Sequence, residues 1–518
     1  MPNRSTEPLY LLIQSLEKAE KRNFKLYLKR HSGGEDLKTV LLFDAIDKMS
    51  DYDEELLLKK NPSLQKQQLP NLKAYLYRQI LTSLRLIKNE LNIDLQLHEQ
   101  MDFARILYNK GLYLQSLKVL DKMKELAKTH HQYTYLQQVL FFEKKIETLY
   151  ITRSLQDRAE ALIQEADAVS DHLTQTSNLS NLSIELYSWY IRNGHARNEK
   201  DVAIINTVFE KHFPDKNRQV NGFYEQLYLH QSYCWLAFIK QDFLQYYRHT
   251  QKWVDLFHQE PFMIEAETGH YIKGMHNLLG AHFDLQNYSK FDETLQQFEL
   301  FSQEKLVTSN LNNNMLVFVY LSIARLNKHF TEGTFDEGIL LVPGIEAKLR
   351  EYELKLDRHR ILIFYYKFAS LYFGSGDYET AIDYLNKIIN WKMDLRTDLQ
   401  CYSRLLHLIA HYEIGNYRLL EFLFKSVYRF MAKMENLSLV EEEIFKFLRQ
   451  SFKLTPKSMQ SAFSKLLDKL KKQERNQFET RAFVYLDIIS WLESKIQGVP
   501  VQEVIRQKYL NKKTVYQE

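Results

Sequence analysis

Two histidines, His407 and His411, form the pair in this sequence whose spacing best suits metal binding. They lie four residues apart in a segment of helical periodicity, so their imidazoles would share one face of a helix. A stable zinc site needs further ligands, and the nearby Glu413 would point away from the pair. We therefore expect the two histidines to pack in the interior, and we expect no bound metal and no cofactor.

The two cysteines, Cys234 and Cys401, are the other candidates for chemistry. Cys234 follows His230 by four residues, and a nucleophilic thiol would need such a base beside it. A cysteine on a helix also serves as a compact apolar side chain, and this is the role that we expect for Cys234. Neither cysteine belongs to a CxxC pair, so we expect no zinc site and no disulfide framework, as in a reducing cytoplasm.

The sequence lacks the common catalytic and nucleotide-binding motifs. It contains no GxxxxGK[ST], GxGxxG, HExxH or GxSxG. It has only 15 glycines in 518 residues, and therefore few of the irregular loops on which catalytic groups usually lie. We predict a protein that acts by binding and not by catalysis.

The elements that would position these residues follow from length and composition. A chain of 518 residues exceeds the roughly 250 to 300 residues of a single core, so it must form several domains or a repeat array. With 15 Gly and 9 Pro, long helices joined by short connections are expected. No apolar run approaches the ~18 residues that span a bilayer. The first 20 residues lack the layout of a signal peptide, and we expect a cytoplasmic protein.

Residues 365–389, YYKFASLYFGSGDYETAIDYLNKII, contain the clearest structural pattern. Apolar or small residues fall on one face of a first helix, Gly376-Asp377 breaks it, and a second amphipathic helix follows. This layout resembles the tetratricopeptide repeat (TPR) family, in which Gly-x-Tyr opens the second helix of each hairpin. Ala369 and Ala381 lie where that family needs small side chains. The resemblance is strongest over residues 362–430 and implies an antiparallel helical hairpin there.

The turn pattern recurs with a period of about 43 residues, against about 34 in standard TPR repeats. It precedes the aromatic residues Tyr113, Phe243, Tyr288, Phe335 and Tyr417. Two further hairpins should lie between Tyr113 and Phe243. Their helices are expected at 133–151, 156–169, 179–193 and 199–213, with turns at Arg153-Ser154 and Gly194-His195. The prediction is an all-α fold, a right-handed α-solenoid of TPR-like antiparallel helical hairpins with helical N- and C-terminal caps.

The pattern divides the chain into three predicted parts. These are an N-terminal helical domain at 1–95, the TPR-like solenoid at 96–437 and a basic C-terminal helical cap at 438–518. In the first part, short helices should break at Gly33-Gly34, and a long helix should open near Pro70 and end near Glu90. In the last part, helices are expected at 483–495 and 501–509.

The TPR resemblance also implies a binding surface. In that family the first helix of each hairpin lines a concave wall, and ligands contact the positions between its core residues. The corresponding residues here are Arg105, Tyr228, Lys273, His276, Asn277, Tyr366, Lys367 and Tyr402. Such a wall suits an extended or helical peptide, anchored by rings and oriented by Lys273 and Lys367. The Lys and Asn set that clamps chaperone tails is not found on three successive repeats, so chaperone tails are not expected ligands.

Positive charge gathers at the C-terminal end, where residues 446–518 hold 15 Lys+Arg against 7 Asp+Glu. Such an end can attract nucleic acid or anionic lipid. Lys465, Lys469 and Lys472 also have the spacing of a solvated helix face, which is the interpretation that we prefer.

Two functions of different class follow. The first is a non-catalytic scaffold or adaptor that binds a protein or peptide in the concave groove. The alternative is a peptide-responsive transcriptional regulator, similar to bacterial regulators that combine a DNA-binding N-terminal domain with a TPR-like solenoid. Its support is residues 40–90, where helices carrying Lys73, Arg78, Arg85 and Lys88 could form a helix-turn-helix. Against it, residues 1–95 hold 16 Lys+Arg and 13 Asp+Glu, a weak excess for DNA binding.

Overall fold

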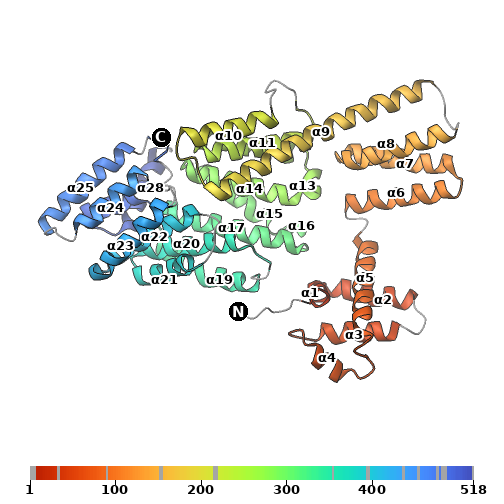
Figure 1. The fold of residues 1–518 in the computed structure, drawn as a ribbon, viewed down its shortest axis with the longest axis horizontal. Coiled ribbons are helices and arrows are strands. Elements are labelled where there is room, and N and C mark those ends of the chain that lie inside the picture. The colour runs from red at the N-terminus through yellow and green to blue at the C-terminus, as the bar shows by residue number, and fades with distance from the viewer. Residues whose placement is uncertain are drawn as a thin grey trace. The chain divides into compact units, whose positions relative to one another are not determined.

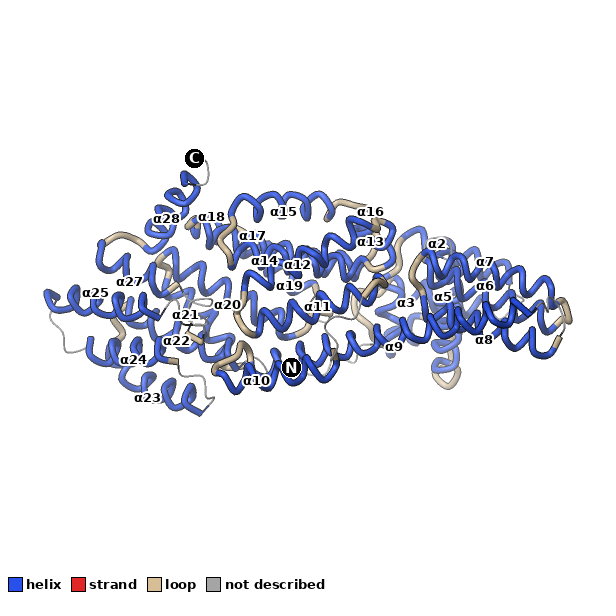
Figure 2. Tube along the Cα trace, turned by 90° about the horizontal axis from the view of Figure 1, so that it is seen from above, coloured by secondary structure: helices blue, strands red, loops and turns tan. Residues whose placement is uncertain are grey.

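The regular secondary structure is helical wherever the chain is described (Figure 2). The computed structural model describes residues 7–31, 36–88, 92–150, 156–213, 220–352, 355–391, 397–433, 438–451, 456–473, 476, 478–479 and 487–515. The prediction of an all-α protein is confirmed over these ranges. Within them, no helix has both the length and the apolar character that crossing a bilayer requires.

The chain divides into two compact units, residues 1–166 and 167–518, each formed by helices that pack on their neighbours in sequence (Figure 1). The division falls within one long helix, α9. The domain boundaries predicted after residues 95 and 437 stay predictions.

The first unit contains α1 to α8 and the start of α9. Their bounds are Pro8–Ser15 (α1), Lys18–His31 (α2), Asp36–Asp47 (α3), Glu54–Lys60 (α4), Leu69–Lys88 (α5), Ile93–Asn109 (α6), Tyr113–Thr129 (α7), Tyr133–Leu149 (α8) and Gln156–Asn193 (α9).

Helices α1 to α5 share one apolar core, which includes Leu9, Ile13, Phe24 and Phe43. The Asp53 side chain caps α4, because it accepts a hydrogen bond from the Leu56 backbone N–H at 3.0 Å. The long helix predicted to open near Pro70 is α5. The predicted break at Gly33-Gly34 lies outside the described residues.

The second unit contains the rest of α9 and the helices α10 to α28. Their bounds are Glu199–His212 (α10), Phe223–Ile239 (α11), Phe243–Gln259 (α12), Phe262–Ala266 (α13), Thr268–Asp284 (α14), Tyr288–Phe301 (α15), Lys305–Thr308 (α16), Leu311–Glu332 (α17), Phe335–Ile339 (α18), Val342–Glu351 (α19), Arg358–Ser375 (α20), Tyr378–Ile389 (α21), Thr397–Glu413 (α22), Tyr417–Lys433 (α23), Leu439–Ser451 (α24), Pro456–Gln473 (α25), Ile488–Gln497 (α27) and Val501–Val515 (α28).

The turn pattern marks real helix starts. Each of the six aromatic residues that it identified is the first residue of a helix: α7, α12, α15, α18, α21 or α23. Two positions earlier, the backbone is left-handed in every case, with φ between 54° and 92°. A residue in this conformation ends one helix and redirects the chain, so that the next helix packs back on the first. A seventh turn of this kind, at His131 before α8, was missed by the pattern.

One predicted break between two helices is wrong. The helices expected at 156–169 and 179–193 are a single helix of 38 residues, α9. The intervening sequence contains no glycine or proline, and its Ser and Thr side chains bond back to the helix, as Thr174 does to the Ser170 carbonyl at 2.8 Å. These residues also include Asn178, which tolerates the left-handed conformation, so the local sequence permits a turn that the chain does not make. The turn expected at Arg153-Ser154 lies outside the described residues.

The last helix, α28, packs on α17 and α20, well over a hundred residues earlier in the chain. Its first turns lie against Gly333, the left-handed residue that ends α17. Residues 483–486 of a predicted C-terminal helix lie outside the described residues, and the remainder corresponds to the start of α27.

Candidate functional site

The residues predicted for a binding groove fall into two separate groups. Arg105 lies exposed on α6, in the first unit. The other seven lie in the second unit, on α11, α14, α20 and α22. Arg105 therefore does not belong to the site described below.

Three of the seven are core residues. Tyr402 is 1% exposed, Tyr366 is 6% exposed and Asn277 is 8% exposed. Burial also raises the pKa of the Tyr366 hydroxyl. Substituting these side chains would remove packing, so they are not candidates for ligand contact.

The burial of Tyr402 follows from the position of α22. This helix is buried on nearly every face, and the turn after α9 lies against its first residues. A Cβ atom placed on Gly194 would come within 3.4 Å of the Asp398 Cβ atom. Two segments about two hundred residues apart thus meet at α22, and the face that the TPR register assigns to ligand is covered by protein.

Lys273 and His276 both lie against a residue that the sequence analysis did not single out, Tyr320 on α17. The His276 ring stacks on the Tyr320 ring, with centroids 4.1 Å apart and planes 13° apart. The Lys273 ammonium lies 5.1 Å from the centre of the same ring. The Arg360 guanidinium of α20 lies 5.8 Å from it and donates a hydrogen bond to the Tyr320 hydroxyl at 3.3 Å.

Lys367 lies two helical turns beyond Arg360 on α20. Its ammonium donates to the Asn327 side-chain oxygen at 2.5 Å and lies 5.2 Å from the centre of the Phe330 ring. The tyrosine cluster and this second cation thus lie along the same three packed helices, α14, α17 and α20.

The protonation of this cluster is strongly perturbed. Burial lowers the pKa of Lys367 to about 8, although Asp284 opposes the shift. Burial, together with Lys273, Lys367 and Arg360, holds the pKa of His276 well below its usual value, so the imidazole is neutral at pH 7. Burial raises the pKa of Asp284 to about 7. Both Lys367 and His276 nevertheless keep part of their surface in solvent.

Charge compensation in the cluster is incomplete. Arg360 pairs with Asp357 at 2.9 Å, and half of the Asp357 side chain is exposed. Among the described residues, no carboxylate lies within 4 Å of the ammonium of Lys273 or of Lys367. Burial raises the pKa of Tyr320, but Lys273 and Arg360 more than offset this, so that its pKa is below the usual value. The cluster is a region of positive potential.

Tyr320 could have been found in the sequence. Tyr228, Lys273 and Tyr402 each precede a turn aromatic by fifteen residues, and Tyr320 precedes Phe335 by the same number. The predicted groove left out the helix before Phe335. Arg360 lies outside that register, and only the packing of α17 on α20 brings it to the ring.

The remaining groove residue, Tyr228 on α11, is partly buried. Its ring meets the His270 ring edge-on at 6.0 Å, and burial followed by the charge of Glu267 raises its pKa. It is a packing contact between α11 and the start of α14.

The candidates for chemistry are packed in the interior. Cys234 is 2% exposed, and burial raises the pKa of its thiol to about 12, so no thiolate forms at pH 7. Its sulfur lies 3.4 Å from the Thr250 hydroxyl, and the nearby His230 contacts His249. This confirms the packing role expected for Cys234.

The two histidines of α22 lie in contact, with Nε2 atoms 3.3 Å apart, and both are 6% exposed. Burial, then His411 and Arg404, lowers the pKa of His407 to about 4. Glu413 accepts a hydrogen bond from the Trp491 indole at 2.6 Å and pairs with Lys495. In the part of the chain that the structure describes, no three His, Cys, Asp or Glu side chains are arranged to hold a metal ion.

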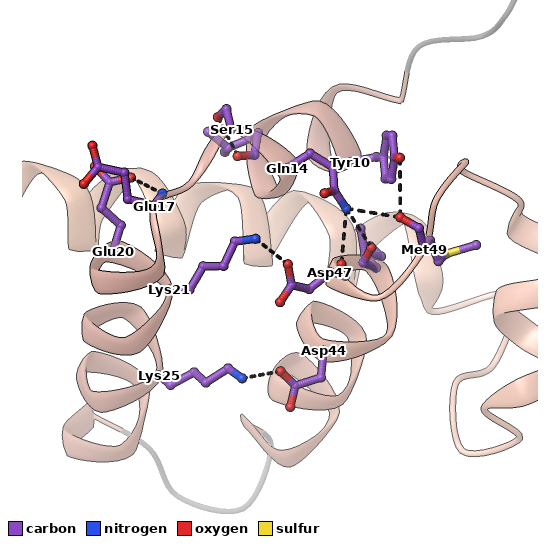
Figure 3. A network of polar contacts seen from close by, with 12 residues as sticks. Tyr10, Gln14, Ser15, Glu17, Glu20, Lys21, Lys25, Asp44, Asp47 and Met49 are labelled. Carbon is purple, nitrogen blue, oxygen red and sulfur yellow. Dashed lines mark hydrogen bonds and ion pairs between the residues drawn. The ribbon is translucent and has the colours of Figure 1, made fainter. Parts of the chain in front are cut away.

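A second charged surface lies on α2, in the first unit. Lys18, Lys21, Arg22, Lys25 and Lys29 border one open stretch of its surface. Figure 3 shows that Lys21 and Lys25 reach across to Asp47 and Asp44 of α3, each at 2.6 Å. The other three cations have no described carboxylate within ion-pair distance and form an exposed basic stripe.

Two of the four basic side chains expected to read DNA form ion pairs. Lys73 pairs with Glu54 at 2.6 Å and with Glu7 at 3.5 Å, and Arg85 pairs with Asp102 at 3.0 Å. Lys73 and Arg85 are thus engaged with carboxylates, and the DNA-binding role of this segment stays a prediction.

Part of the basic charge at the C-terminal end is paired with carboxylates. Lys469 pairs with Glu443, Lys471 and Lys508 pair with Glu493, and these nitrogen to oxygen distances are 2.6 to 2.8 Å. This arrangement fits the solvated helix face that we preferred.

Comparison of the chain with models of known protein families and with curated proteins finds no match in either case.

Proposed function

We propose that this chain is a non-catalytic binding protein, a right-handed solenoid of TPR-like helical hairpins that holds a peptide segment of a partner protein against α14, α17 and α20. Support for the repeat architecture comes from the seven turns in which a left-handed residue precedes an aromatic helix start by two positions. One local geometry used seven times is typical of a repeat array.

The observation that carries the binding role is the charged cluster around Tyr320. Helices that only pack in a core bury apolar or fully paired side chains. Here, three packed helices direct Lys273, Arg360 and Lys367 to one partly exposed region in which two ammonium groups have no described carboxylate within 4 Å. Such an arrangement costs folding free energy, and it is best explained by a ligand that uses it.

Site-specific photocrosslinking in the native cell tests this proposal. Tyr187 of α9 is 42% exposed, and its hydroxyl is close enough to influence the pKa of Arg360. A benzoylphenylalanine at this position should form a covalent adduct with one defined partner segment. Leu300 of α15 is 62% exposed and provides the control, because it lies on the second helix of its pair. Adducts from Leu300 alone would contradict the proposed face.

The exposed stripe on α2 favours a second candidate, a nucleic-acid-binding role for the first unit. Lys18, Arg22 and Lys29 lie at helical spacing on one face, and no described carboxylate lies within ion-pair distance of them. This candidate differs from a helix-turn-helix reading of α5, whose Lys73 is tied to Glu54.

Fluorescence anisotropy with the full chain and a labelled 20-base-pair duplex tests it. If α2 binds phosphates, the triple variant Lys18→Glu, Arg22→Glu, Lys29→Glu should lose binding, and the wild-type affinity should fall steeply as salt rises. The double variant Lys465→Glu, Lys472→Glu at the C-terminal end is the matched control and should bind the duplex as wild type does. Unchanged binding by the triple variant would exclude α2 as the contact.

A further inference from the structure

The cluster around Tyr320 has the chemistry of an anion site. Lys273 and Arg360 come from different helices, α14 and α20, and both lie within 6 Å of the centre of one ring. Among the described residues of α17, no carboxylate lies within ion-pair distance of Lys273 or Arg360. Both charges therefore add to the positive potential around this ring, which a bound anion would lower.

The donors suit an oxyanion in particular. A guanidinium offers five N–H donors in a planar fork. In Arg360, one nitrogen pairs with the Asp357 carboxylate and another donates to the Tyr320 hydroxyl. The pair with Asp357 is half exposed and therefore weak, so a ligand oxyanion can compete for it. The Lys273 ammonium adds a point charge from the neighbouring helix.

We propose that Lys273 and Arg360 hold an oxyanion of the bound segment, a carboxylate or a phosphate, beside the Tyr320 ring. This inference rests on the proposed function, since it names the chemistry of the segment. Lys367, seven residues after Arg360 and so about 10 Å further along α20, extends the positive potential toward a neighbouring residue of the same segment.

Lysine footprinting on the full chain tests the site without any partner. The probes are inorganic phosphate and acetate, each titrated against sodium chloride at constant pH and ionic strength so that general screening cancels. Propionylation of each lysine by an N-hydroxysuccinimide ester is followed by mass spectrometry. When the anion reaches about twice its Kd, two thirds of the sites are filled, and modification of Lys273 should slow about threefold. Lys252, exposed on α12, is the control and should not change.

Two variants separate a built site from general attraction. Arg360→Gln should abolish the protection of Lys273 although Lys273 itself is untouched, whereas Arg360→Lys should retain part of it. Asp357→Asn should act in the opposite sense. It removes the competing carboxylate, retains a side chain that can cap α20, and should tighten anion binding about two- to fivefold. Far-ultraviolet circular dichroism confirms that each variant is folded.

The outcomes are distinct. Protection by phosphate alone assigns a phosphorylated segment, and protection by acetate alone assigns an acidic one. The proposed site would be overturned if neither anion slowed the modification of Lys273 relative to that of Lys252. It would also be overturned if the protection of Lys273 survived Arg360→Gln. The crosslinking at Tyr187 does not depend on either result. If a partner binds this face through uncharged groups, the crosslinking succeeds and supports the proposed function, although the anion site is wrong.

Discussion

At the scale of single residues, burial decides what the polar side chains of this protein can do. His407 and His411 have the spacing of a metal pair, and Cys234 has a histidine one helical turn away. Each is nearly inaccessible, and each has a pKa shifted toward its neutral form. Lys367 is different, because it keeps part of its surface in solvent and, with a pKa of about 8, stays charged at pH 7 although burial disfavours the charge.

Lys367 allows a test of that cost. Its pKa is about 8 in the folded chain, below the usual 10.5, so between these values the unfolded chain binds more protons. Stability therefore rises with pH through this window, and below pH 8 the full penalty is present. We expect Lys367→Met to be more stable than wild type at pH 7, by about 1 to 3 kcal/mol, and to lose this advantage by about pH 10.5.

Urea denaturation at the two pH values measures the difference. Lys252→Met, at an exposed position of α12, is the matched control and should change little. A less stable Lys367→Met protein at pH 7 would mean that the hydrogen bond to Asn327 outweighs the cost of burying the charge.

At the scale of elements, the repeated unit is a left-handed residue followed two positions later by an aromatic helix start. Glycine occupies the left-handed position at four of the seven turns. His131, Gln241 and Gln286 occupy it at the others, with φ of 54° to 59°, where side chains are disfavoured. The packing of the two flanking helices must therefore impose the turn at these three positions.

Ala381 tests the close approach of the two helices in the best-defined pair, α20 and α21. Its side chain is fully buried where the sequence pattern requires a small residue. Ala381→Leu should destabilise the protein by about 1 to 3 kcal/mol, since three extra carbon atoms must fit into a packed crossing. Asp383→Leu places the same side chain at an exposed position of α21 and is the control. Equal melting temperatures for the two variants would refute the close crossing.

At the scale of the whole second unit, the chain returns to segments that are distant in sequence. The turn after α9 lies against α22, and α28 lies against the end of α17. These contacts join segments that a register drawn from one hairpin would leave apart.

Gly333 is the point of closest approach of α28. A Cβ atom there would lie 2.6 Å from the Arg506 backbone nitrogen and 2.6 Å from the Gln502 carbonyl oxygen. Gly333→Ala should therefore displace α28 and cost about 2 to 4 kcal/mol, part of it from the positive φ. Hydrogen exchange of residues 501–515 measures the displacement. Gly376→Ala is the matched control, because Gly376 also has positive φ but no atom within 4 Å of its Cβ position. Equal protection of α28 in both variants would contradict the contact.

Acid should destabilise the second unit as a whole. Burial lowers the pKa of four of its histidines to about 3 or 4, and that of a fifth well below the usual 6.5: His230, His249, His282, His407 and His276. The unfolded chain binds the extra protons as pH falls from 6.5 toward 4, so stability is lost in this window, by up to about 1.4 kcal/mol per pH unit for each histidine. The denaturant midpoint should fall steeply between pH 6.5 and 4. A midpoint that is constant over this range would show that these imidazoles are accessible to protons in the folded unit.

The sequence by itself determined the helical class, six of the seven aromatic helix starts that follow a left-handed residue by two positions, and the interior role of Cys234. These features depend on local periodicity and on backbone conformation within a few residues, which a sequence carries directly. It could not reveal that α9 continues through 170–178, because breaking a helix there depends on what packs beside it.

The candidate site was only partly predictable for the same reason. Periodicity selected Lys273, His276 and Lys367, which are partly exposed, but also Tyr366, Tyr402 and Asn277, which are buried. Whether such a face meets solvent or protein depends on long-range contacts such as those of Gly194 with Asp398. Arg360 joins the site because α20 packs on α17, and no spacing along one helix encodes the distance between side chains of two helices.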